Sequence, residues 1–123
     1  MEFQLELFVK KIEASVAFYL QLLPFSILRR EADYVELQYG NITLAFCSFS
    51  GLSAGHYLRK HSEVLGSRME LRFQVENIEQ VYHQTQERNI KIYEPLRQRP
   101  WGKTDFRVTD PDGAYIRITS PLM

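Results

Sequence analysis

The sequence predicts an α+β fold made of two successive βαβββ modules. A segment in which apolar and polar residues alternate is followed directly by one of helical spacing, and this happens twice, in F-V-K-K-I-E-A-S-V-A-F-Y and in F-Q-V-E-N-I-E-Q-V-Y. Three further short alternating segments follow each helix. We expect residues 1–123 to form a single domain of two modules, 1–47 and 68–123, joined by a linker at 48–67, because each half is too short to be an independent domain.

The first module is expected to begin with a strand and a helix. Apolar and polar residues alternate over 2–9, and the helical period of 12–23 ends at Pro24, which cannot continue a helix. Gly40 and Asn41 form a dipeptide that favours a hairpin turn. The three strands after the helix are expected at residues 25–30, 34–39 and 42–47.

The second module repeats this order after the linker. Residues 48–67 are rich in Ser and Gly and carry no sustained period, so we expect at most one helical turn there, at 56–60. Asn77 and Gln80 have the spacing of a capping box before the second helix, and Asn89 suits its C-terminal end. Strands are expected at 69–75 and 90–93, with two more within 100–118.

The strongest local signal is the turn Asp110-Pro111-Asp112-Gly113. Proline presets φ at the second position, Asp can accept hydrogen bonds from nearby backbone amides, and Gly tolerates the left-handed conformation. Alternating segments flank this turn on both sides, and the dipeptide W-G precedes them. The four residues of the turn therefore have a structural role.

This C-terminal run, from Pro100 to Ile118, resembles the end of the glyoxalase/bleomycin-resistance/dioxygenase superfamily (the vicinal oxygen chelate fold). With its two βαβββ modules, the resemblance covers essentially the full chain. It implies that the strands of both modules curl into an incomplete barrel-like sheet around a cleft, with the helices on the outer face. It also implies a homodimer, which accords with an aromatic content of 13% and zero formal net charge.

Composition excludes several classes of partner. Lys plus Arg and Asp plus Glu both number 15, and no basic stripe stands out, so nucleic acid is not expected as a partner. No apolar run approaches the ~18 residues of a membrane span, and the N-terminus lacks the apolar core of a signal peptide. The single cysteine, Cys47, cannot form an intramolecular disulfide. We expect a cytoplasmic protein that binds no membrane.

The resemblance places the alternate residues of four strands in the cleft and their apolar neighbours, such as Leu5, Leu7 and Val9, toward the helices. An aromatic side chain at the mouth of the cleft corresponds to Trp101, which suits a platform for a planar ligand and a packing residue at a dimer contact equally well. An interior so polar favours a solvated or liganded cleft. The expected ligand-binding residues are Gln4, Glu6, Phe8, Cys47, Glu70, Arg72, Gln74, Trp101, Tyr115 and Arg117.

Metal-dependent members of the superfamily hold a divalent ion at four inward positions, which match Gln4, Ala45, Glu70 and Arg117 here. Ala45 has no ligating atom, and Arg117 is a permanent cation that repels a divalent ion. We therefore predict no metal and no other cofactor, and an ion pair between Arg117 and Glu70 across the cleft at the vacated position. The alternative is that both side chains point into solvent.

Function is expected to be binding of a small polar organic ligand without metal. Glu6 and Glu70 against Arg72 and Arg117 favour a zwitterionic or mixed polar ligand. One alternative is a glyoxalase-like lyase or isomerase, or an extradiol dioxygenase, whose divalent metal would be held by Gln4, Glu70 and a linker histidine. Another is a structural or regulatory role with a vestigial cleft. Whether the protein is an enzyme stays open, and no catalytic residue is assigned. The histidines, expected at the surface, are His56, His61 and His83.

Overall fold

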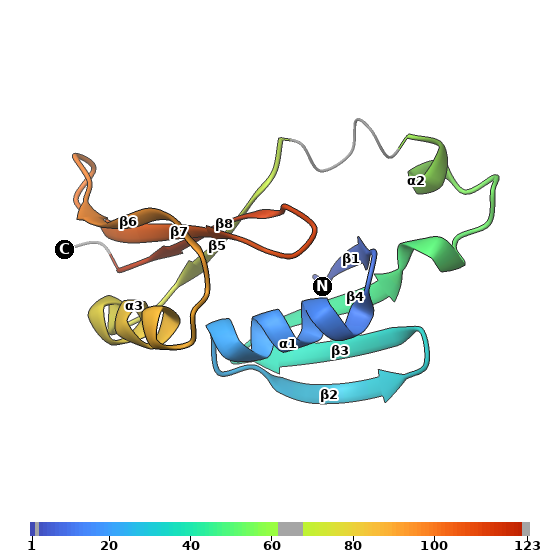
Figure 1. Ribbon diagram of the computed structural model, residues 1–123, viewed down its shortest axis with the longest axis horizontal. Helices are drawn as coiled ribbons and strands as arrows, with labels where there is room; N and C mark the ends of the chain where they lie inside the picture. The colour runs from blue at the N-terminus through green and yellow to red at the C-terminus, as the bar shows by residue number, and fades with distance from the viewer. Residues whose placement is uncertain (2, 62–67, 122–123) are drawn as a thin grey trace. The chain divides into compact units, whose positions relative to one another are not determined.

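The computed structural model describes residue 1 and residues 3–61 and 68–121. The chain divides into two compact units, Met1–Ser67 and Arg68–Met123 (Figure 1). Each unit holds one open four-stranded sheet and repeats the order strand, helix, three strands. The predicted α+β fold of two βαβββ modules is therefore confirmed. None of the described helices is long and apolar enough to cross a membrane.

The sheet of the first unit has the strand order β1-β4-β3-β2. β1 runs parallel to β4, and the remaining neighbours are antiparallel. A short 3-10 helix (Phe49–Gly51) and α2 (Tyr57–Lys60) follow the last strand. The elements of the βαβββ module are β1 (Leu5–Val9), α1 (Ile12–Leu22), β2 (Ser26–Glu31), β3 (Tyr34–Tyr39) and β4 (Ile42–Ser48).

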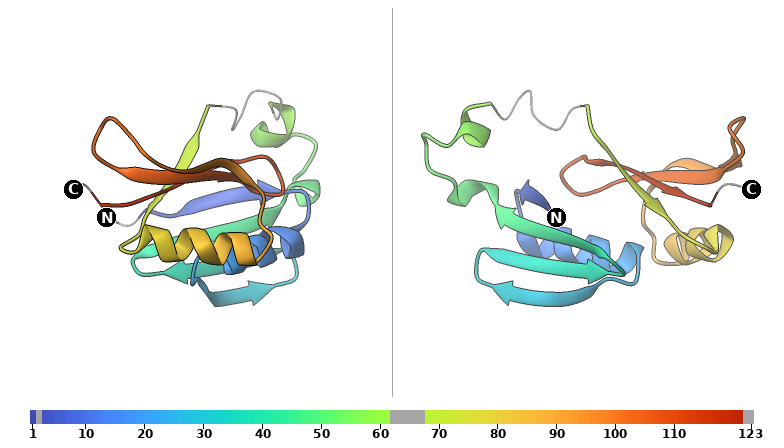
Figure 2. Two further views of the ribbon diagram at one scale, coloured as in Figure 1. Left: turned by 60° about the vertical axis from the view of Figure 1, so that its left-hand side comes forward. Right: turned by 180° about the vertical axis from the view of Figure 1, so that it is seen from behind.

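The core of the first unit lies between α1 and the strands β3 and β4 (Figure 2). Val16, Tyr19 and Leu22 recur at helical spacing, so they share one face of α1, and all three are buried. The Tyr19 ring lies 5.2 Å from that of Phe46 on β4. Each such side chain contributes roughly 1.5–3 kcal/mol through burial. The strand residues buried with them are Val35, Leu37, Leu44 and Phe46.

The second unit repeats this arrangement, with the strand order β5-β8-β7-β6 and β5 parallel to β8. Its core strand residues, all fully buried, are Phe106, Val108, Ile116 and Ile118. Tyr82 of the helix lies 5.0 Å from the Phe106 ring, so the helix covers the apolar face of the sheet. The elements are β5 (Glu70–Gln74), α3 (Ile78–Glu87), β6 (Ile92–Gln98), β7 (Thr104–Thr109) and β8 (Tyr115–Thr119).

The ends of α3 follow the expected capping. The Asn77 side chain accepts a hydrogen bond from the Gln80 amide at 3.1 Å and donates one to the Gln80 side chain at 3.3 Å. Asn89 has φ of +56°, the left-handed conformation that commonly follows a helix. The capping box and the helix end were both predicted correctly.

Several predicted boundaries were wrong. The first strand was expected over 2–9 but starts at Leu5, where its pairing with β4 starts, so Gln4 precedes it; Glu2 lies outside the described residues. β6 was expected over 90–93 but spans Ile92–Gln98. The extension contains Pro95, which an edge strand tolerates at a bulge, and the register of β6 shifts on both sides of Glu94.

The linker contains more structure than predicted. The expected turn at 56–60 is present as α2, whereas the 3-10 helix was not predicted because a single turn leaves no sustained period. Residues 62–67 of the predicted linker lie outside the described residues.

The predicted turn between β7 and β8 is confirmed in detail. The Asp110 carboxylate accepts hydrogen bonds from the amides of Asp112 at 2.9 Å and Ala114 at 2.8 Å. The Gly113 amide donates to the Asp110 carbonyl at 2.9 Å, and Gly113 has φ of +87°. Only a residue without Cβ adopts this conformation freely, so the turn depends on glycine at this position.

Gly113→Ala should destabilise the protein by about 1–2 kcal/mol, because alanine is strained at positive φ. A Cβ at Gly113 meets no atom within 4 Å, so the expected loss comes from the backbone alone. Gly55→Ala is the matched control, because its surroundings are equally open and its φ lies outside the left-handed range. Urea unfolding of both variants measures the difference in their free energies of unfolding. Equal stability of the two variants would contradict the requirement for glycine at position 113.

Candidate functional site

Three arginines lie side by side on the polar face of the second sheet, the face opposite its buried core. Arg72 on β5 pairs in register with Arg117 on β8, and Arg117 pairs in register with Arg107 on β7. We refer to Arg72, Arg117 and Arg107 as the arginine row. Like charges opposite each other on neighbouring strands destabilise a sheet, so this row requires negative partners.

Glu70 supplies the first of these partners. One carboxylate oxygen, Oε1, accepts from Arg117 Nε at 2.9 Å, and the other, Oε2, accepts from Arg72 Nη2 at 3.3 Å. The side chains of Arg117 and Glu70 are only 18% and 23% exposed, which limits screening by solvent. The predicted ion pair between Arg117 and Glu70 is confirmed, but it joins adjacent strands of a single sheet.

Asp105 supplies the second partner. Its side chain is fully buried and lies beside two arginines: Arg99 Nε is 3.0 Å and Arg107 Nε 3.3 Å from Oδ1. Arg107 also donates to the Tyr115 hydroxyl at 3.0 Å. Burial lowers the pKa of Arg107, but the hydrogen bonds to Tyr115 and Asp105 outweigh it and raise that pKa above its ordinary value. Arg107 is thus fully engaged within the second unit.

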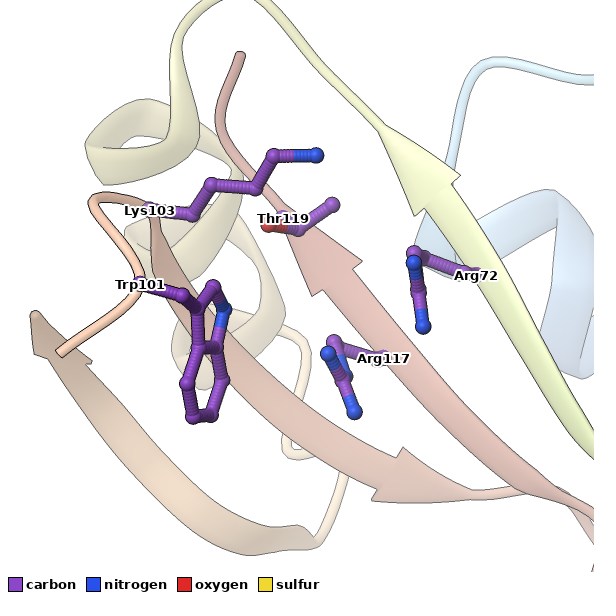
Figure 3. A pocket seen from close by; sticks show the side chains of 5 residues that line it. All are labelled: Arg72, Trp101, Lys103, Arg117 and Thr119. Atoms are coloured by element: carbon purple, nitrogen blue, oxygen red, sulfur yellow. The ribbon is translucent and has the colours of Figure 1, made fainter. Parts of the chain in front are cut away.

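A cavity of about 340 Å³ opens on this face beside Arg72 and Arg117 (Figure 3). Thr119 of β8 also lines it, and Trp101 and Lys103 reach it from the loop between β6 and β7. The guanidinium carbon of Arg117 lies 5.7 Å from the centre of the Trp101 ring, within the range of a cation–π contact. The cavity therefore combines an aromatic surface with three cations.

The loop geometry explains why Trp101 and Lys103 meet the sheet residues. The Arg99 amide donates to the Lys103 carbonyl at 2.7 Å, and the Gly102 amide donates to the Arg99 carbonyl at 3.1 Å. Gly102 has φ of +90°, which makes this tight reversal possible. The W-G dipeptide noted in the sequence is therefore the element that points both side chains at the cavity.

Only part of the predicted site comes together in this cavity. Arg72, Trp101 and Arg117 line it, and Glu70 lies next to it through its two ion pairs. Lys103 and Asp105 were missed, although the alternation of β7 could have placed Asp105 on the polar face. Among the described residues, Gln74 and Tyr115 share this face of the sheet but do not line the cavity.

The remaining predicted residues belong to the first unit. Gln4 is exposed and precedes β1, while Ala45 is buried between Glu6 and Glu36, its neighbours in register on β1 and β3. Two residues further along the same strands, Cys47 pairs in register with Phe8, whose ring lies 6.1 Å from that of His56.

The histidines differ in their surroundings. His56 is half-buried and accepts a hydrogen bond from the Leu58 amide, so it caps α2; the surface prediction is wrong for it. His61 and His83 are exposed, as predicted. In the described part of the chain, no group of three or more His, Cys, Asp and Glu side chains could hold a metal ion.

The Cys47 thiol should react slowly at neutral pH. Burial, followed by its hydrogen bond to Glu6 at 2.7 Å and the charge of Glu6, raises its pKa from 9.0 to about 11. At pH 8 the thiolate fraction is then about 1 in 1,000, against about 1 in 10 for an unperturbed thiol, and the thiolate is the reactive form. The pH profile of iodoacetamide alkylation measures this value.

Glu6→Gln should lower the alkylation midpoint without returning it to 9.0, because burial of the thiol persists. Glu13→Gln on α1 is the control and should leave the midpoint unchanged. A wild-type midpoint near pH 9 would contradict the contact between Cys47 and Glu6.

The comparisons with known proteins agree with this fold. The family model of the glyoxalase-like domain matches residues 3–123. The chain therefore belongs to the glyoxalase-like domain family, within the superfamily that the sequence resembled. A comparison with curated proteins gave no match.

Solved structures resemble the chain over nearly its full length. A glyoxalase/bleomycin resistance protein/dioxygenase family enzyme from Burkholderia phytofirmans has a TM-score of 0.82 at 19% identity, covering 97% of both chains. A protein of unknown function from Agrobacterium tumefaciens has a TM-score of 0.79 at 27% identity, covering 99% of this chain and 95% of the other. A bleomycin-binding protein complexed with bleomycin has a TM-score of 0.69 at 23% identity, covering 98% of both.

Proposed function

We propose that the protein binds a small organic ligand without a metal ion, and that the cavity beside Arg72 and Arg117 contributes the contact surface. The observation that carries this proposal is the position of Glu70. Its two carboxylate oxygens accept from two different arginines, so the one acidic side chain at a family metal position is already engaged.

The other three metal positions support the same conclusion. Ala45 has no ligating atom, Arg117 is a cation, and Gln4 offers only a neutral amide. Releasing Glu70 to a divalent ion would leave Arg72 and Arg117 side by side, next to the added charge of the metal. The residues at these four positions do not fit a divalent ion, so we derive no chemical step through one.

The comparisons support a binding role by analogy. The bleomycin-binding protein has this fold and holds a small molecule, whereas the Burkholderia neighbour is described as an enzyme. Because one fold can serve both as a binding protein and as an enzyme, the residues of the site must decide between the two roles. We also propose that the protein is a cytoplasmic homodimer. The exposed apolar side chains of Ile27 and Leu28 on the edge strand β2 are consistent with self-association.

Elemental analysis of protein purified without chelators tests the proposal, together with thermal unfolding in Ni²⁺, Zn²⁺, Mn²⁺ and Fe²⁺. We expect far less than one metal ion per chain and no stabilisation. An ion present at 100 times its Kd would stabilise the fold by about 2.7 kcal/mol, which is readily detected as a rise in Tm. Stoichiometric metal or such a rise would contradict the proposal and favour the lyase, isomerase or dioxygenase alternative.

The variants Glu70→Ala and Glu76→Ala make the metal test specific. Glu76 is exposed in the same unit and serves as the control for loss of one carboxylate. We expect both variants to have the same low metal content as the wild type. Loss of bound metal in Glu70→Ala alone would identify Glu70 as a ligand and overturn the proposal.

A further inference from the structure

We infer that the ligand of this cavity is an oxyanion, a carboxylate or a phosphate, carried on a planar ring. The inference rests on the proposed function and specifies the class of ligand. It is based on the excess of positive charge at the cavity and on the N–H donors there that make no hydrogen bond within the described part of the chain.

The charge of the cavity is positive. Arg72, Lys103 and Arg117 line it, and among the described residues that line it none is acidic. Glu70, the adjacent carboxylate, supplies one negative charge to be shared by two arginines. Asp105 does not offset the remainder, because it is already paired with Arg99 and Arg107. A bound anion would remove the repulsion that this arrangement leaves.

The cations also retain hydrogen-bond donors. Arg117 donates from Nε to the Glu70 carboxylate, and its two terminal nitrogens make no hydrogen bond to another described residue. Arg72 donates only from Nη2, and the ammonium group of Lys103, a half-buried residue, has no ion pair within the described part of the chain. Planar guanidinium groups with free N–H pairs match the two oxygens of a carboxylate or phosphate. The cavity therefore offers donors and, among its charged side chains, no acceptor.

Trp101 provides the surface for the ring. Trp101 is 51% exposed even though its ring lies near the Arg117 guanidinium, so much of its aromatic surface remains available to a planar ligand. A cavity of about 340 Å³ is at the small end of ligand pockets, which suits one ring with one charged substituent. Figure 3 shows Trp101 beside Arg117, so a ring on the indole would have its substituent within the part of the cavity that the cations line.

The zwitterionic ligand predicted from sequence is replaced by this inference. That prediction rested on the presence of both signs of charge in the cleft, with Glu6 and Glu70 against Arg72 and Arg117. Glu70 is paired with both arginines, and Glu6, in the first unit, accepts from the Cys47 thiol.

Titration of the full-length protein with benzoate, phenyl phosphate, benzamide and acetate tests the inference, with binding followed by calorimetry and by Trp101 fluorescence. Benzoate or phenyl phosphate should bind at least tenfold more tightly than neutral benzamide, because charge-assisted hydrogen bonds are lost in the amide. Acetate should bind about two- to tenfold more weakly than benzoate, because it lacks the ring. Which of benzoate and phenyl phosphate binds more tightly identifies the oxyanion.

Lys103→Gln should weaken binding of the preferred anion about tenfold, whereas Lys91→Gln, which removes an exposed lysine outside the cavity in the same unit, should change it less than twofold. Trp101→Leu should abolish the difference between benzoate and acetate. Urea unfolding of each variant checks that the fold is retained.

Equal binding of benzamide and benzoate, an unchanged Kd in Lys103→Gln, or no binding of either aromatic anion would each overturn the inference. None of these results would affect the proposed metal independence. Stoichiometric metal in the elemental analysis would instead refute the proposed function whatever the anions do.

Discussion

The arginine row is the constraint on which the rest of the second unit depends. Three neighbouring strands place Arg72, Arg117 and Arg107 in register, and the sheet tolerates this because Glu70 and Asp105 lie within reach of them. The two carboxylates have different effects. Asp105 is fully buried and holds its partners on the scaffold, whereas Glu70 lies at the cavity and leaves terminal donors of Arg72 and Arg117 free. The buried ion pairs of Asp105 and the cavity proposed for ligand binding therefore lie on neighbouring strands of one sheet.

The two units share strand order and helix placement but carry different chemistry on their polar faces. In the first unit, Ala45 lies in register between Glu6 and Glu36, where a small side chain separates two acids. In the second unit, Arg117 lies in register between two other arginines. The polar faces of the two modules therefore carry opposite local charge on the same arrangement of strands. This is possible because successive side chains of a strand point to opposite faces, so the polar face can change while the core residues are retained.

Sequence periodicity predicted the modules well, since apolar alternation and helical spacing are the patterns that burial imposes. Together with the family resemblance, it also placed Arg72, Glu70 and Arg117 on one face. It missed the extension of β6, because Pro95 reads as a strand breaker until the edge position is known. Lys103 was missed because its direction depends on the reversal at Gly102. Gln4 was assigned to a strand on alternation alone, although its strand begins one residue later.

A double-mutant cycle on Glu70→Ala and Arg117→Ala, measured by urea unfolding, tests most directly whether this ion pair organises the polar face of the second sheet. The partly buried pair should show a coupling free energy of about 1–2 kcal/mol, reduced from that of a fully buried pair by its residual exposure. The more exposed pair Glu94 and Arg97 on β6 is the control, with expected coupling below about 0.5 kcal/mol. Additive effects for Glu70 and Arg117 would contradict the claim that their ion pair organises this face.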